Sequence, residues 1–251
     1  MARIAITGST TGVGFDAAER LVELGHSVVV HARNAERAAT LPAEWPVVVG
    51  DLEEADQVRS VAAQFDALGP YDAVIHNAGI DETPTRRTNS VGECTITAVN
   101  VYAPYVLTAL MARPPRLIYL SSSSHYPGIA TLDDVHWHQR PWDGTQAYCN
   151  SKLLLTTFAM AIAHRWPNTV VQSVDPGWVP TRMGGADAPD DLVLGHRTQV
   201  WLATADHEQA LHSGGYWFHR DRLTPHEATT DPAFQRAVLE HLRAATGVEL
   251  P

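Results

Sequence analysis

The sequence predicts an α/β fold in which one doubly wound parallel sheet is covered by helices on both faces. Short apolar runs alternate along the chain with longer stretches that have the apolar spacing of helices. This alternation implies right-handed crossovers between parallel strands. The 251 residues contain no linker, internal repeat or low-complexity segment, so we expect a single domain over residues 1–251.

Each predicted element has a signal in the sequence. Strands are expected at Ile4–Ile6, Val28–Val30, Val47–Val49, Ala73–Ile75, Leu117–Leu120, Val170–Val174 and Tyr216–Phe218. Helices are expected at Val13–Leu24, Ala35 to about Leu41, Glu53–Leu68, about Glu93 to Met111, Thr145–Ile162, Asp191–Ala205 and about Pro232 to Ala245. Asn34 can cap the second helix, while Gly25, Gly69-Pro70 and Pro114-Pro115 end the first, third and fourth.

Composition and charge argue against several function classes. The net charge is −10 and lysine and arginine form no cluster, so neither nucleic acid nor an anionic membrane is expected as a partner. We also expect no signal peptide and no membrane span. Cys94 and Cys149 are far apart, which favours a reducing compartment, the cytoplasm, over a disulfide framework. The pair His136-x-His138 lacks a third ligand at suitable spacing, so no metal is expected.

A glycine-rich turn follows the first predicted strand and opens the first helix: Thr7-Gly8-Ser9-Thr10-Thr11-Gly12-Val13-Gly14. Such a turn lets backbone N–H groups approach a pyrophosphate, and the helix N-terminus adds partial positive charge. A bare Gly-x-Gly also occurs in ordinary turns. In this strand-turn-helix context, however, the pattern predicts a dinucleotide site.

Tyr148 and Lys152 stand four residues apart on a predicted helix. That spacing puts both side chains on one face, about one turn apart. A phenol is a poor acid or base near neutral pH because its ordinary pKa is about 10, but a nearby ammonium lowers that pKa. The pair is therefore a candidate general acid/base, although this spacing alone also occurs on many helices without catalytic function.

Five motifs, taken together and in this order, resemble the short-chain dehydrogenase/reductase family. They are Thr7-Gly8-x-x-x-Gly12-x-Gly14, Asn77-Ala78-Gly79, Ser121-Ser122, Tyr148-x-x-x-Lys152 and Pro176-Gly177. The resemblance covers nearly the whole chain and is closest to the single-domain branch. It implies a Rossmann fold that binds a nicotinamide cofactor and transfers a hydride.

The resemblance also implies roles for individual residues. Tyr148 would donate the proton to a substrate carbonyl oxygen, and Lys152 would hold the nicotinamide ribose and lower the pKa of the tyrosine. Ser122 would hydrogen-bond the substrate oxygen; its hydroxyl can instead be satisfied by its own loop. Asn100 would position a water for proton relay, whereas without the resemblance it reads as a solvent-facing helix residue.

The cofactor contacts that the resemblance implies lie after the strands and on the central helix. They are Gly8, Ser9, Thr10, Gly12, Val13, Gly14, Arg33, Asp51, Leu52, Asn77, Ala78, Gly79, Tyr148, Lys152, Pro176, Gly177, Val179 and Thr181.

The end of the second strand predicts NADP(H) rather than NAD(H). Rossmann proteins that prefer NAD usually place an acidic residue there, which would repel a 2′-phosphate. Here Ala32 stands at the position of the family's aspartate, and Arg33 follows it. A guanidinium is well suited to a phosphate, although an arginine at this position can also be a solvated surface residue.

Two segments depart from the family pattern. Ser122 and Tyr148 are 26 positions apart, about twice the usual spacing, and the extra segment His125–Asp143 is rich in histidine and aromatic residues. Its composition resembles the retinol-dehydrogenase and anthracycline-ketoreductase members, which suggests a bulky apolar substrate. The segment is expected to border the substrate pocket or an oligomer contact. Gly184 to Pro189 has the composition of a substrate-covering loop or of a plain surface loop.

Three function classes fit the sequence to different degrees. An NADP(H)-dependent carbonyl reductase or alcohol dehydrogenase explains the complete Asn-Ser-Tyr-Lys set. A regulatory protein that senses NADP(H) without turnover usually loses the tyrosine or lysine, and a structural module leaves the aligned polar residues unexplained. Related enzymes commonly pair through the helix that carries Tyr148 and the helix from Glu93 to Met111, so we expect a homodimer unless the inserted segment blocks pairing.

Overall fold

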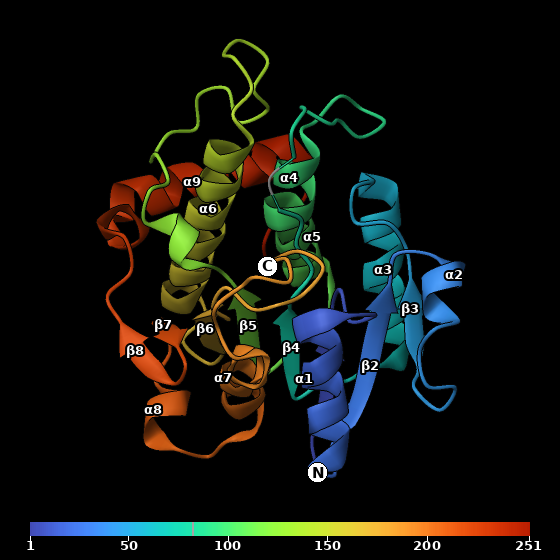
Figure 1. Ribbon diagram of the computed structural model, residues 1–251. Helices are drawn as coiled ribbons and strands as arrows, with labels where there is room; N and C mark the ends of the chain where they lie inside the picture. Colours follow the sequence, from blue (N-terminus) through green and yellow to red (C-terminus); the bar gives the residue numbers. More distant parts are fainter. Residues whose placement is uncertain (82) are drawn as a thin grey trace.

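The computed structural model describes residues 1–81 and 83–251, arranged as in Figure 1. In this part of the chain eight strands form one sheet, in the order β3-β2-β1-β4-β5-β6-β7-β8. The strands are β1 (Arg3–Ile6), β2 (Ser27–Ala32), β3 (Val47–Val49), β4 (Ala73–His76), β5 (Arg116–Leu120), β6 (Val170–Asp175), β7 (Gly215–Phe218) and β8 (Asp221–Leu223). Strands β1 to β7 run parallel, and β8 pairs antiparallel with β7.

Helices lie between the strands and after the last strand. They are α1 (Gly12–Glu23), α2 (Ala35–Ala38), α3 (Ala55–Leu68), α4 (Thr95–Thr97), η1 (Ala98–Tyr102), α5 (Ala103–Leu110), η2 (Ser123–His125), α6 (Gly144–Arg165), α7 (Leu192–Thr204), α8 (Glu208–Leu211), η3 (Glu227–Thr230) and α9 (Pro232–Thr246). Asp143 caps α6 by accepting a hydrogen bond from the Gln146 N–H at 2.9 Å.

Two apolar layers hold the helices to the sheet. Successive side chains of a strand point to opposite faces, and β4 shows the result. Its Val74 packs with α3, α5 and α6, whereas Ala73 and Ile75 pack with α1 and α7. Figure 1 shows these two sets of helices on opposite sides of the sheet. The expected Rossmann-type fold, with helices on both faces, is confirmed.

The structure corrects the sequence-based elements in three places. The edge strand β8 is antiparallel and was not expected, because Asp221–Leu223 is exposed along its whole length and gives no apolar signal. The expected helix from Glu93 to Met111 begins at Thr95 and is interrupted by the π-helical segment η1. Helix α2 ends at Ala38 rather than near Leu41. Among the described residues, no helix has the length and apolar character needed to cross a membrane.

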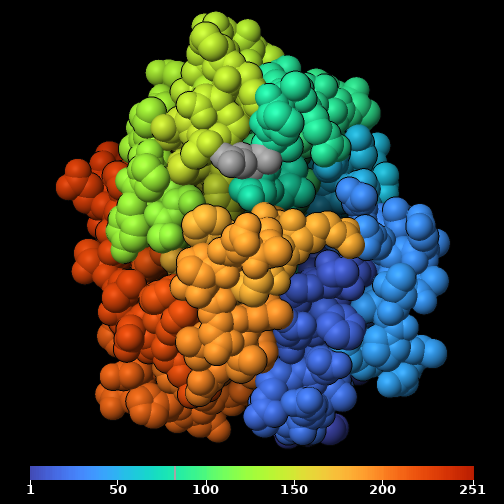
Figure 2. Space-filling view, viewed as in Figure 1, coloured from blue at the N-terminus to red at the C-terminus, as the bar shows by residue number. Residues whose placement is uncertain are grey.

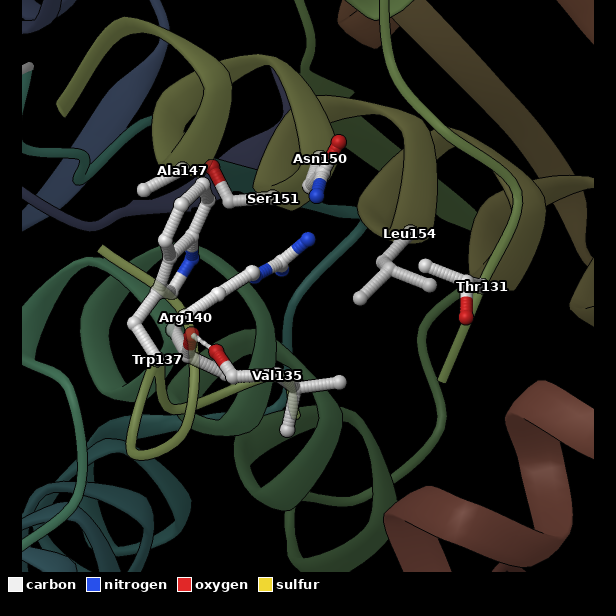
Figure 3. A pocket seen from close by; sticks show the side chains of 9 residues that line it. Thr131, Val135, Trp137, Arg140, Ala147, Asn150, Ser151 and Leu154 are labelled. Atoms are coloured by element: carbon white, nitrogen blue, oxygen red, sulfur yellow. Dashed lines mark hydrogen bonds between the residues drawn. The ribbon is translucent and has the colours of Figure 1, made fainter. Parts of the chain in front are cut away.

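The inserted segment His125–Asp143 packs over the ends of two helices. Trp137 and Trp142 from this segment form a small apolar cluster with Ile96 of α4 and Ala147 of α6. Figure 3 shows Arg140 and Trp137 opposite the side chains of α6, across a cavity of about 10 Å³, which is room for about one water. This part of the insert therefore fills space against the helices.

The insert also carries a histidine network. The His136 ring accepts a hydrogen bond from the Cys94 N–H at 3.2 Å through Nδ1, so its Nε2–H faces the Tyr102 hydroxyl at 3.3 Å. That hydroxyl lies 3.0 Å from Nε2 of His241 on α9. Burial lowers the pKa of His136 to about 4, and electrostatic interactions with His138, His241 and Arg86 act in the same direction. The network joins the insert, η1 and α9.

Helices α5 and α6 are covered on all sides by the chain itself. Every residue of α6 from Ala147 to Ile162 is buried except Tyr148, and so is every residue of α5 from Ala103 to Thr108. Val238 and Leu242 of α9 belong to the apolar cluster that encloses both helices. These two helices therefore present almost no free face to a partner.

Candidate active site

The candidate site lies where the strand order reverses. β1 and β4 are neighbours in the sheet, and the chain leaves them in opposite directions, toward β2 on one side and β5 on the other. Open parallel sheets bind ligands in the crevice outside the carboxyl ends of the strands at such a point. The glycine-rich turn follows β1 there, and Asn77 follows β4.

The glycine-rich turn is locked to the turn after β4. The Thr7 hydroxyl accepts hydrogen bonds from the N–H groups of Asn77 and Ala78, both at 3.0 Å. In return, the Asn77 amide donates to the carbonyls of Thr7 at 3.0 Å and Gly8 at 2.9 Å. Gly8 has φ +65°, and a side chain there would come within 2.6 Å of the Ala78 Cα. Only glycine fits this close approach.

The N-terminus of α1 is open to an anion. Thr11 makes no side-chain capping bond among the described residues, and the first turn of α1 carries no acidic residue. Thr10, Gly12 and Val13 are partly exposed, whereas the Ser9 hydroxyl is buried and donates to the Ile6 carbonyl at 3.0 Å. Unpaired N–H groups and the helix dipole suit a pyrophosphate here. Ser9 itself supports the turn.

His31 is a residue of this site that the sequence did not single out. Its Nδ1 accepts the Gly8 N–H at 3.1 Å, so its Nε2–H donates to the Gly50 carbonyl at 2.8 Å. Burial lowers the pKa of His31, which favours the neutral ring that this pattern requires. The ring thus links the glycine-rich turn to the loop after β3. No sequence pattern marks it, because its partners are fixed by the pairing of β1, β2 and β3.

Three further expected cofactor residues lie on the β2–β3 side of the switch point. Arg33 follows β2, and its Nε is 4.0 Å from Oδ2 of Asp51, which follows β3. The Arg33 side chain is 54% exposed and thus free to meet a ligand. Leu52 is buried in the apolar core. On the opposite side, the Tyr148 and Lys152 side chains lie beyond β4, next to β5.

Lys152 is the only lysine in the chain. It is 5% exposed, and its ammonium donates a hydrogen bond to the Leu120 carbonyl at the end of β5, at 2.8 Å. Burial lowers the pKa of Lys152 to about 8, although the nearby carboxylates of Asp175 and Asp81 act in the opposite direction. The expected helical pair with Tyr148 is present, with the ammonium 5.5 Å from the centre of the phenol ring.

Asn100 lies in the π-helical segment η1 and is buried. It is therefore not the solvent-facing helix residue that its position in the sequence alone suggests. Its amide group pairs with the Ile80 backbone, accepting from the N–H and donating to the carbonyl, both at 2.9 Å. It also donates to the Ser151 hydroxyl at 3.0 Å. A methyl group placed on Gly79 would be 3.5 Å from both the Asn100 Oδ1 and the Lys152 Nζ. The glycine therefore leaves a small space between these two polar groups.

Ser122 and Tyr148 meet through their hydroxyl groups. Ser122 begins the short helix η2 by accepting the Ser124 N–H at 3.1 Å, and its hydroxyl is near enough to the Tyr148 hydroxyl to lower the pKa of the phenol. Burial raises the pKa of Tyr148, and the negative charges of Asp81 and Asp175 add to this, while the Ser122 hydrogen bond lowers it. The 26-residue separation in sequence thus does not separate these two groups in space.

The turn after β6 closes the site on the other side. Gly177 adopts φ +85° and its N–H donates to the Asp175 carboxylate at 2.9 Å. Thr181 lies over the glycine-rich turn, because a side chain on Gly12 would come within 3.1 Å of the Thr181 methyl. Val179 is buried next to Gly195 of α7. Figure 2 shows this segment, in orange, on the surface between the N-terminal part in blue and the insert in lime.

The resulting arrangement has a definite chemical capacity. Two hydroxyl groups, from Ser122 and Tyr148, converge at the end of β5, and the buried ammonium of Lys152 is one helical turn away. Such a set can donate hydrogen bonds to an oxygen that gains negative charge, and can deliver a proton to it. The adjoining glycine-rich turn can hold a dinucleotide. Fold and site together define a Rossmann-type oxidoreductase.

The chain belongs to the short-chain dehydrogenase family. The family model described as short chain dehydrogenase matches residues 2–191. Two relatives, the short-chain dehydrogenases chry4 of Gibberella zeae and chyC of Penicillium rubens, are each 39% identical to this chain. The alignments cover 100% of this chain, and 99% of chry4 and 100% of chyC. DnrU of Streptomyces sp., whose name describes a daunorubicin C-13 ketoreductase, is 31% identical over 96% of this chain and 91% of its own.

Solved structures share the fold. An uncharacterized protein of Mycobacterium paratuberculosis superposes with a TM-score of 0.86 at 23% identity, covering 100% of this chain and 95% of the other. An NADPH-bound carbonyl reductase from chicken fatty liver gives a TM-score of 0.67 at 18% identity, covering 90% and 99%. At these identities the likeness concerns the fold alone.

Proposed function

We propose that the protein is an NADP(H)-dependent oxidoreductase that interconverts a carbonyl compound and an alcohol. The observation that carries this proposal is the convergence of the Ser122 and Tyr148 side chains, with the Lys152 ammonium 5.5 Å from the Tyr148 ring, beside the glycine-rich turn. A protein that only senses the cofactor has no need for such an arrangement. In this proposal the whole chain acts as one domain.

In the proposed reaction Tyr148 is the proton donor for carbonyl reduction. Its hydroxyl delivers a proton to the substrate oxygen, and Ser122 stabilises the negative charge that develops on that oxygen. The buried Lys152 ammonium orients the sugar of the cofactor and favours the phenolate that forms. Asn100 and the space beside Gly79 provide for a water that returns a proton to Lys152. When bound, the cofactor supplies or accepts the hydride.

The observed residues fit a dinucleotide with a 2′-phosphate. The open N-terminus of α1 and the turn from Gly8 to Gly14 would hold the pyrophosphate. The exposed Arg33 would pair with the 2′-phosphate, and its present partner, Asp51, is only loosely held at 4.0 Å. Pro176, Gly177, Val179 and Thr181 would border the nicotinamide. The carbonyl reductase from chicken fatty liver, which is bound to NADPH, supports this choice by analogy of fold.

A bulky apolar substrate is the proposed class. Large apolar side chains are exposed on the two segments that follow β5 and β6: Tyr126 at 41% and Ile129 at 50%, and Trp178 at 61% and Met183 at 45%. Exposed apolar surface of this kind suits an apolar ligand. The name of DnrU, a daunorubicin C-13 ketoreductase, agrees with this class.

Location and assembly are proposed on separate grounds. Cys94 and Cys149 are buried thiols, which suits the cytoplasm. The family resemblance predicts a homodimer paired through α6 and the helix after β4. Because the chain itself covers these helices, we propose that they are not available for pairing.

The deciding experiment measures oxidation of NADPH and NADH by the purified protein with aldehydes, small ketones and polycyclic ketones. Turnover with NADPH and the larger ketones is expected. Absence of turnover with every carbonyl and alcohol, in a protein that binds NADPH, would favour a sensing role instead.

A further inference from the structure

We propose that Asp175 is a positioning residue of the active site: the buried counter-charge that keeps the Lys152 side chain in its ammonium form. The inference rests on the proposed function only for its effect on turnover. Its central claim, that the buried Asp175 charge acts on the buried Lys152 ammonium, concerns the protein alone.

The placement of Asp175 follows from the sheet. It is the last residue of β6, and its neighbour Val174 pairs with Leu120, the last residue of β5. Leu120 is also the residue whose carbonyl accepts the Lys152 hydrogen bond. Carboxylate and ammonium therefore lie at the carboxyl ends of two adjacent parallel strands, without a direct ion pair between them. Asp175 is 4% exposed, so little water lies between it and its surroundings.

The Asp175 carboxylate is held by two donors. Its Oδ1 accepts from the Gly177 N–H at 2.9 Å, and its Oδ2 accepts from the Tyr216 hydroxyl at 3.2 Å. Tyr216 belongs to β7, so β6, the turn after it and β7 together fix the position of the charge. Charge-assisted hydrogen bonds of this kind restrict a side chain strongly. The carboxylate cannot turn toward solvent without losing both.

The Lys152 ammonium needs such a charge. Burial disfavours an ammonium, and the carboxylate of Asp175 opposes that effect more strongly than Asp81 does. The groups that face this pair come from all surrounding elements: Asp81 after β4, Tyr148 on α6, His125 and Tyr126 after β5, and Tyr216 on β7. In this set of described residues the two aspartates are the acids. Asp175 is the one built into the sheet.

The single lysine makes a direct test possible. Protein labelled with ¹³C at the lysine Cε carbon gives one side-chain signal, that of Lys152, and its pH titration reports the ammonium without substrate or turnover. Asp175→Asn is nearly isosteric and keeps an acceptor for the Gly177 N–H. We expect the titration midpoint, near pH 8 in the native protein, to fall by about one pH unit or more in this variant, the effect of losing a nearby opposite charge.

Two further variants separate charge from structure. Tyr216→Phe removes one hydrogen bond but keeps the carboxylate, so the Lys152 midpoint should stay near the native value. Asp175→Ser is a second charge-free variant, for use if Asp175→Asn unfolds, and it should lower the midpoint in the same direction. A folded charge-free variant with the native midpoint would overturn the proposal, and so would a Tyr216→Phe shift as large as that of Asp175→Asn.

Loss of the Asp175 charge should also change how kcat/KM depends on pH. If Lys152 acts as proposed, the alkaline limb of kcat/KM moves to lower pH in Asp175→Asn, and kcat near pH 6 changes little. A shifted lysine titration in a protein without turnover would refute the proposed function and leave the role of Asp175 intact. If the Lys152 midpoint of Asp175→Asn stays native while the protein turns over normally, the role of Asp175 is refuted and the proposed function stands.

Discussion

The Lys152 ammonium lies 5.5 Å from the centre of the Tyr148 ring, one turn away on α6. From sequence, the ammonium is expected to lower the pKa of the tyrosine. In the structure, burial outweighs other effects and raises the pKa of Tyr148, with the Ser122 hydrogen bond acting in the lowering direction. The phenol thus stays protonated at neutral pH. This state suits the proton donor that the proposed carbonyl reduction requires.

Replacement of Tyr148 by phenylalanine tests the donor. We expect turnover to fall by at least about a hundredfold, the lower end of what a positioned general acid contributes, with NADPH affinity and the fold retained. Steady-state rates and cofactor titration measure both quantities. Tyr71→Phe is the matched control, because it removes a buried hydroxyl that donates to the Phe65 carbonyl at 2.7 Å, away from the site. Native turnover in Tyr148→Phe would remove this residue from the mechanism.

Acid stability should depend on His136. Its folded pKa, about 4, lies below the ordinary value of 6.5, so the unfolded chain takes up a proton first. The free energy of unfolding should therefore be unaffected above about pH 6.5 and fall between pH 6.5 and 4. Since His136 is only half-buried, we expect its share of the loss to be about 1 to 2 kcal/mol.

Denaturant unfolding at several pH values checks this. His136→Gln should reduce the fall in the free energy of unfolding between pH 6.5 and 4. His212→Gln, at an exposed position, should leave that fall unchanged. An unchanged slope in His136→Gln would show that protonation of this ring does not weaken the fold.

Because α5 and α6 are covered by the chain itself, we expect a monomer in solution. Sedimentation of the native protein is expected to give one species near 27.4 kDa. Leu110 at the end of α5 is 38% exposed and would lie in a contact through this helix. We expect Leu110→Arg to sediment with the same mass as the native protein. A native dimer that this substitution dissociates would show that α5 takes part in pairing after all.

The sequence predicts the core of the fold and of the site because both depend on local signals. Apolar runs mark β1 to β7, and the motifs with Gly8, Asn77, Ser122 and Pro176 all follow a strand directly, so the parallel sheet brings them to one edge. The exposed strand β8 has no such signal.

Contacts set by strand register were not predictable in this way. His31 meets Gly8, and Asp175 meets Tyr216, only because particular strands lie side by side. The π-helical turn around Asn100 likewise depends on its hydrogen bonds to Ile80, which is 20 positions away. None of these residues stands in a periodic pattern that would single out its partner.

The choice of cofactor rests on Arg33. Its Nε is 4.0 Å from the Asp51 carboxylate, and both side chains remain open to solvent, so a 2′-phosphate can take the place of that weak ion pair. Loss of one charged hydrogen-bonding partner costs about 1.5 to 3 kcal/mol, so Arg33→Ala should weaken NADPH binding by roughly ten- to a hundredfold and leave NADH nearly unchanged. Arg37→Ala, which removes the same charge from the exposed helix α2, is the matched control and should change neither affinity by more than about twofold. Fluorescence titration with both cofactors gives the four dissociation constants needed for each comparison. A native protein that binds NADH more tightly than NADPH, or an Arg33→Ala variant that weakens both equally, would refute the assignment to the 2′-phosphate.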